Sequence, residues 1–303
     1  MAAPLRLPRL LHRRIEALAA DLLTAPGLPP VDFLTPAGEP ALAPATSVSW
    51  RVFKNPVTLF IGGVAAVLLE LGEPRVRHGV WEHSDFRTAP MARLQRTGLA
   101  AMVTVYGAAS TATAMIAGIT RMHARVSGTT EAGLAYSATD PDLLDWVEAT
   151  AAFGFLEAYA AFAAPIVEAD RDLYFSEGLA AARLYGATGA PGSEQDWQHM
   201  LARLRPVLEP SPTLAEFLSI IRRVPALPRL GRPAQLMLVK AAVDILPAGI
   251  AGQLQLGPEW RLRSWERALV QAMARTADRL VLASWPAVEA CRRLGLPNHH
   301  LYR

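Results

Sequence analysis

The sequence predicts an all-α protein. Apolar residues recur at the three- and four-residue spacing of helices along most of the 303 residues, and alternating β-strand patterns are scarce. Hydrophobic residues make up 51% of the chain and charged residues only 19%, a composition that excludes a disordered or coiled-coil protein. We therefore expect one helical domain over residues 49–303, preceded by an N-terminal helix and a proline-rich arm over residues 1–48.

The first elements follow from proline and glycine positions. A basic first helix is expected at about residues 8–24, and the prolines of residues 25–48 indicate an extended arm. Asn55-Pro56 opens an apolar helix, because proline is well placed in a first turn, and Gly72 ends it. Residues 74–90 are polar and aromatic and are expected to form a connector.

The central and C-terminal segments are also helical. Pro90 opens a helix that runs into a small-residue stretch and ends at Gly128, and Asp140-Pro141 opens another. The remaining helices are expected at residues 170–185, 195–207, 213–223, 233–245, 258–281 and 285–294, with a loop at 186–194.

The composition of the chain indicates its cellular compartment and the kinds of partner it binds. The mean hydropathy is +0.20, and residues 97–120 are long enough to cross a bilayer. That segment is rich in Ala, Thr, Ser and Gly, so we expect a buried helix and no stable membrane span, with a cofactor-free membrane protein as the alternative. The absence of a signal-peptide pattern and a single cysteine, Cys291, favour the cytoplasm, with an organellar transit peptide as the weaker alternative. Dispersed arginines and a net charge of +3 argue against nucleic acid.

His123 is the main candidate site residue. Walker, HExxH and GxSxG motifs are absent, and His123 follows Ile116, Ile119 and Thr120 on one helical face. A histidine in this position is commonly a core or capping residue. The alternative is an axial ligand of haem iron, since imidazole above an apolar surface suits a flat porphyrin. Arg121 and Arg125 would then pair with haem propionates, or else interact with the helix C-terminus.

A second group of polar residues precedes His123. Arg93, Arg96 and Thr97 lie within one helical turn, and small residues follow them, which allow a planar cofactor or another helix to approach closely. Arg96 and His123 are 27 residues apart, so an unbroken helix would separate them by about 40 Å. Both can contact one cofactor only if the chain reverses between them, and Gly107–Ser110 is the natural break.

Several segments together carry a family resemblance: NPVTLFIGGVAAVLLELGEPRVRHGVWEHSDF (55–86), RLQRTGLAAMVTVYG (93–107), RMHARVSG (121–128) and DPDLLDWVEAT (140–150). They resemble the MpaB-type oxygenases, which include the latex-clearing rubber oxygenases. The resemblance implies a globin-like helical core around haem b, with additional N- and C-terminal helices, and O2-dependent oxidation of an alkene or isoprenoid. It places the proximal iron ligand at His123 and the polar distal groups at Arg93, Arg96 and Thr97.

The chain departs from that family in two positions. Arg96 replaces a lysine that can ligate iron, and guanidinium has no lone pair to offer, so Arg96 is expected to donate hydrogen bonds to bound O2 instead. Glu148 replaces a histidine that relatives often carry. Glu82 is a candidate for the distal base proposed in rubber oxygenases, and its alternative is a solvated carboxylate.

The expected reaction is oxidation or cleavage of a small lipophilic substrate by O2. An apolar wall is expected from Leu99, Met102, Val103, Tyr106, Phe153 and Phe155, with Tyr106 contacting the cofactor; each is otherwise a core residue. A haem-binding sensor or peroxidase-like protein without oxygenase turnover is the alternative. The sequence does not reveal the oligomeric state.

Overall fold

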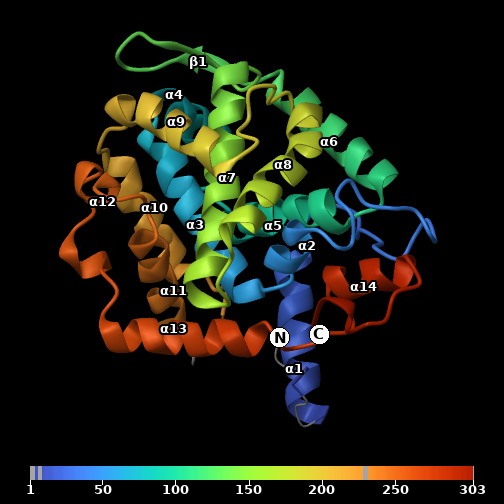
Figure 1. Ribbon diagram of the computed structural model, residues 1–303. Coiled ribbons are helices and arrows are strands. Elements are labelled where there is room, and N and C mark those ends of the chain that lie inside the picture. Colours follow the sequence, from blue (N-terminus) through green and yellow to red (C-terminus); the bar gives the residue numbers. More distant parts are fainter. Residues whose placement is uncertain (1–3, 6–8, 228–230, 303) are drawn as a thin grey trace.

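The computed structural model describes residues 4–5, 9–227 and 231–302, and its fold is all-α (Figure 1). The α-helices are α1 Arg9–Leu23, α2 Val48–Phe53, α3 Pro56–Gly72, α4 Pro74–His83, α5 Pro90–Tyr106, α6 Ala109–His123, α7 Pro141–Phe162, α8 Glu168–Tyr185, α9 Glu194–Leu204, α10 Pro212–Arg223, α11 Arg232–Asp244, α12 Ile250–Gln253, α13 Ser264–Ala277 and α14 Pro286–Arg293. The strands β1 Ser127–Thr129 and β2 Ala135–Ser137 form a short antiparallel hairpin. The all-α prediction is confirmed; the globin-like arrangement and the division at residue 48 stay predictions, and the expected first residue of the first helix, residue 8, lies outside the described residues.

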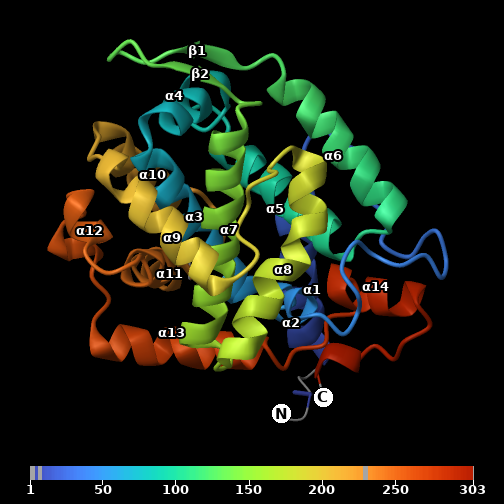
Figure 2. The same cartoon turned by 45° about the horizontal axis from the view of Figure 1, so that its top comes forward.

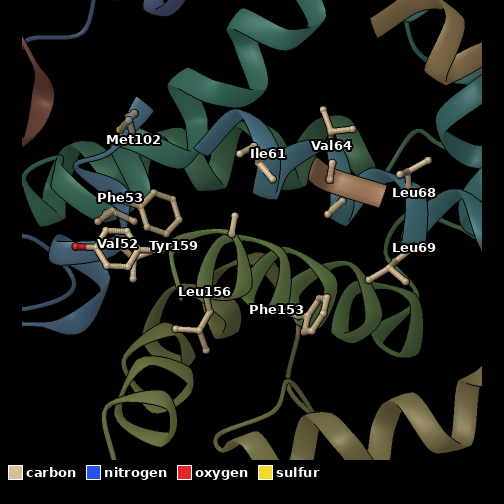
Figure 3. Packing of buried hydrophobic residues seen from close by; sticks show 14 of the residues in the cluster. Val52, Phe53, Ile61, Val64, Leu68, Leu69, Met102, Phe153, Leu156 and Tyr159 are labelled. Atoms are coloured by element: carbon tan, nitrogen blue, oxygen red, sulfur yellow. The ribbon is translucent and has the colours of Figure 1, made fainter. Parts of the chain in front are cut away.

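Helices α3 and α7 form the centre of the fold. In Figure 3, Ile61, Val64, Leu68 and Leu69 lie along α3 opposite residues of α7. The two backbones meet at glycines: a Cβ added to Gly154 would lie 2.4 Å from the carbonyl oxygen of Gly62, too close for any side chain. The glycines that the sequence places in these apolar helices therefore serve a close helix crossing.

Capping side chains explain the helix starts. The Asn55 side chain accepts hydrogen bonds from the amides of Val57 and Thr58, as expected for a cap before Pro56. The expected connector at 74–90 was wrong in its first part, which forms α4. Glu73 causes this difference, because its carboxylate accepts a 2.8 Å hydrogen bond from the Val76 amide and Pro74 occupies the first turn.

The chain reverses between α5 and α6, as predicted. α5 ends at Tyr106 and α6 begins at Ala109, so the 97–120 segment is divided between two helices that pack together (Figure 2). α6 ends at His123, five residues before the predicted end. Gly128 instead pairs with Tyr136 in the hairpin, where a side chain at Gly128 would meet the tyrosine ring.

No single helix in the described part of the chain is long and apolar enough to cross a membrane. α3 and α4 together meet the criteria of length and composition, but their axes bend by 112° at Glu73.

The proline-rich arm is tied to the C-terminal region. Arg293 of α14 is buried, and its guanidinium donates hydrogen bonds to the carbonyl oxygens of Phe33 (2.9 Å) and Glu39 (2.8 Å). The arm also contributes Ala41 and Ala43 to the core. α2, which was not predicted, begins at the end of the arm, where the Ser47 hydroxyl accepts a hydrogen bond from the Trp50 amide.

Candidate active site

His123 lies at the C-terminal end of α6, a helix that packs against α5 and α8. Its Nδ1 atom is buried and has no hydrogen-bond partner among the residues that the structure describes. Burial lowers the pKa of the imidazole, and the positive charge of Arg93 lowers it further. Both effects favour the neutral form of the imidazole, which is the form that coordinates a metal ion.

Arg93 connects His123 with an acidic residue of another helix. It lies in the first turn of α5, and its Nη1 atom donates a hydrogen bond to the Thr97 hydroxyl. Burial lowers the pKa of Arg93, whereas the negative charge of Glu70 on α3 raises it. The guanidinium is thus close enough to both Glu70 and His123 to influence the ionisation of each.

Glu70 is enclosed by α3, α5 and α7. Burial raises its pKa to about 7, although the charge of Arg93 and hydrogen bonding with Thr150 act to lower it. By solvent-accessible surface Glu70 is only half-buried.

The surface of α5 beside Arg93 faces open space. A Cβ added to Gly98 would meet no atom within 4 Å, and Thr97 is exposed although it is one turn from the enclosed Arg93. Within the described residues, no three His, Cys, Asp or Glu side chains gather to hold a free metal ion. A single imidazole without a hydrogen-bond partner among the described residues instead fits a metal that brings its own equatorial ligands, as haem iron does.

Comparison with known proteins identifies the family. The family model described as ER-bound oxygenase mpaB/B'/Rubber oxygenase, catalytic domain, matches residues 50–279. The chain belongs to this family. No curated protein and no solved structure matched the chain. The match includes every helix of the site, so His123, Arg93 and Glu70 lie inside an oxygenase catalytic domain.

Two other polar candidate residues, Arg96 and Glu82, form hydrogen bonds with neighbouring side chains at the surface of the domain. Arg96 donates a 3.0 Å hydrogen bond to Asp85, which is 61% exposed. Glu82 is exposed and accepts a 2.9 Å hydrogen bond from the Tyr136 hydroxyl of the hairpin. The structure therefore places Arg93, to which Thr97 is hydrogen-bonded, near His123, whereas Arg96 and Glu82 pair with other residues.

The remaining candidates divide between surface and core. Arg121 and Arg125 are exposed on either side of His123. Tyr106 is fully buried and donates a 2.7 Å hydrogen bond to the carbonyl oxygen of Trp50, so its contacts give no support to a role at the cofactor.

The expected apolar wall is mostly part of the packed core. Leu99, Met102 and Val103 are buried, and Figure 3 shows Met102 among the residues of α2 and α3, with Phe153 in the packing of α7. These residues face the core because α5 presents its most apolar side to α2 and its polar side, with Arg93, to the site.

Two acidic residues of the interior were not identified from the sequence as site residues. Glu70 is the only charged residue of α3, and that isolation within an apolar helix was the available signal. Glu148 of α7 was noted as a departure from the family but was not assigned a role; burial raises its pKa to about 7 as well.

Proposed function

We propose that this oxygenase-family protein binds haem b through His123 and oxidises a small lipophilic substrate with O2. The observation that carries the proposal is the buried Nδ1 atom of His123, which lies near Arg93 and has no hydrogen-bond partner among the described residues. A buried polar atom without a partner is costly, and iron coordination removes that cost.

Each residue of the site has a role in this proposal. Haem, when bound, supplies an iron centre that binds O2 and carries the oxidation. His123 holds the iron, and Arg93 and Thr97 offer hydrogen-bond donors that stabilise negative charge on oxygen. Glu70 is a positioning residue, because its charge favours the protonated guanidinium of Arg93. The exposed Arg121 and Arg125 are placed to pair with propionates at the rim.

The substrate class follows from the inner face of α6. Met115, Ile116 and Ile119 are apolar, and Met115 and Ile119 are only half-buried in the structure. A lipophilic alkene or isoprenoid-like molecule would cover them and gain the free energy of apolar burial. We propose that the reaction takes place in the cytoplasm on a small metabolite.

Absorbance spectroscopy of the purified protein, reduced and with carbon monoxide, tests the proposal. We expect a Soret band that is lost in His123→Ala, together with O2 consumption in the presence of an alkene substrate. Arg93→Met should keep the haem and lose most O2 consumption, whereas the surface variant Arg96→Ala should keep both.

A colourless wild-type protein, expressed with ample iron and porphyrin, refutes haem binding. Full haem content in His123→Ala refutes the ligand assignment. A haem spectrum without substrate-dependent O2 consumption would favour the second candidate, a haem-binding sensor or peroxidase-like protein.

A further inference from the structure

Helix α13 carries apolar side chains on both of its sides. Val270 and Ala274 are fully buried on the inner side. Trp265 and Leu269, one turn apart, are 56% and 45% exposed on the outer side. The apolar stripe, as we name it, consists of Trp265, Ala268, Leu269 and Ala272, all exposed. Figures 1 and 2 show α13 along the lower edge of the molecule, where no other helix covers the outer side of its N-terminal half.

The acidic charge of this segment is turned inward. Residues 260–277 contain four arginines and one acidic residue, Glu266. Glu266 is only 5% exposed and forms an ion pair with Lys240 of α11 at 2.8 Å. Arg267 is also compensated, because it forms an ion pair with Asp244 at the end of α11. Negative charge in residues 260–277 is therefore absent from the side that carries the apolar stripe.

The other three arginines border the apolar stripe. Arg261 and Arg263 precede α13, and Arg275 lies in its last turn. All three are exposed, and none forms an ion pair with a residue that the structure describes. Leu262, between the first two, is half-buried, so this short segment keeps its apolar side chain against the protein and its charges in solvent. An exposed tryptophan and leucine with unpaired cations around them are thus the character of this surface.

This combination favours an anionic lipid surface as the partner. The amphipathic ring of tryptophan is suited to the boundary between headgroups and hydrocarbon, and arginine pairs well with phosphate. Basic residues near a membrane are attracted to anionic lipids. A second copy of the chain is disfavoured, because a two-fold contact through the stripe would bring the unpaired arginines of both copies together.

We propose that the apolar stripe of α13, with the three arginines beside it, docks the protein on the surface of an anionic membrane. Trp265 and Leu269 enter the boundary region of the bilayer, and the arginines pair with lipid phosphate and carboxylate groups. The contact is peripheral, since the inner side of α13 stays packed in the core. Docking requires neither haem nor the residues around His123.

Sedimentation of the full-length protein with phospholipid vesicles tests this surface. We expect affinity for mixed phosphatidylcholine and phosphatidylserine vesicles to exceed affinity for phosphatidylcholine alone by about tenfold or more. High salt should weaken binding, because the screening length falls from about 10 Å at 0.1 M to about 3 Å at 1 M. Trp265→Ser combined with Leu269→Ser should lower the affinity about tenfold or more, as should Arg261→Glu combined with Arg263→Glu.

Matched controls come from the opposite side of the molecule, where Figure 1 shows the hairpin and α9. Leu134→Ser removes a leucine that is 50% exposed, and Arg203→Glu reverses an exposed arginine of α9. Both variants should bind vesicles like the wild type. His123→Ala should do so too, which separates this test from that of haem binding.

Equal affinity for the two kinds of vesicle overturns the proposal, as does an absence of binding or wild-type affinity in either double variant. A wild-type dimer that dissociates when Trp265 and Leu269 are replaced, without any vesicle binding, overturns it in favour of a second copy. If a double variant loses its helical circular dichroism, the lipid and salt dependence of wild-type binding decides.

Discussion

Replacement of Glu148 by glutamine should change how the stability of the protein depends on pH. The ordinary pKa of this carboxyl is 4.5, and its value in the folded protein is about 7. Each tenfold difference in proton affinity corresponds to about 1.4 kcal/mol, so ionising Glu148 costs the folded state roughly 3–4 kcal/mol at most. The folded protein binds this proton more tightly than the unfolded chain, so stability is lost as the pH rises from 4.5 to 7.

Urea unfolding at pH 5 and pH 8 measures this effect. At pH 5 the side chain is mostly protonated in the folded protein, and Glu148→Gln should have nearly the wild-type free energy of unfolding. At pH 8 the variant should be more stable than the wild type by up to roughly 3–4 kcal/mol, because the amide carries no charge to bury. The reasoning is refuted if the difference between variant and wild type is the same at both pH values.

Glu70→Gln is the informative comparison, because Glu70 has the same raised pKa but lies near Arg93. Its replacement leaves the buried guanidinium without a compensating charge, which is destabilising. We therefore expect no gain in stability at pH 8 from Glu70→Gln. A gain equal to that of Glu148→Gln would show that Arg93 does not interact with Glu70.

Further predictions concern the packing. Gly154→Ala should lower the free energy of unfolding by about 1–3 kcal/mol, because the new methyl group meets the Gly62 carbonyl oxygen. Gly98→Ala should raise the free energy of unfolding by up to about 1 kcal/mol, because alanine has the higher helix propensity and the position has room for a methyl group. Urea unfolding measures both changes. Arg293→Ala removes the buried hydrogen bonds to the arm and should cost about 2 kcal/mol or more, with faster limited proteolysis between residues 33 and 40 as the local measure. Proteolysis of the Arg293→Ala variant at the wild-type rate would contradict the prediction for Arg293.

The helix boundaries were predictable where local chemistry determines them. Asn55-Pro56 and Asp140-Pro141 combine a capping side chain with a proline in the first turn, and both helices begin there. The reversal at Gly107 was also predictable, because contact between two distant polar groups required a break and glycine supplied one. α4 was missed because the Glu73 carboxylate that caps it belongs to a segment whose composition is typical of a loop.

Side-chain direction could not be predicted from the same patterns. Arg93 and Arg96 are three residues apart on one helix, yet Arg93 turns inward toward Glu70 and Arg96 turns outward to Asp85. Both partners come from other segments, so no local property of the helix distinguishes the two arginines. The position of Glu82 also depends on a distant segment. The hydroxyl of Tyr136, in a hairpin more than fifty residues away, donates a hydrogen bond to Glu82 at the surface.

The carboxylates of Glu70 and Glu148 can be recognised from the apolar composition of the helices that carry them. An isolated carboxylate in an apolar helix has few positions that are energetically tolerable, since burial raises its pKa unless a cation is near. Glu70 meets that requirement through Arg93, whereas no cation contributes to the pKa of Glu148, which burial alone raises to about 7. The hydropathy of α3 therefore marks Glu70 in the sequence, but only the tertiary structure shows that Arg93 lies near it and that no cation influences Glu148.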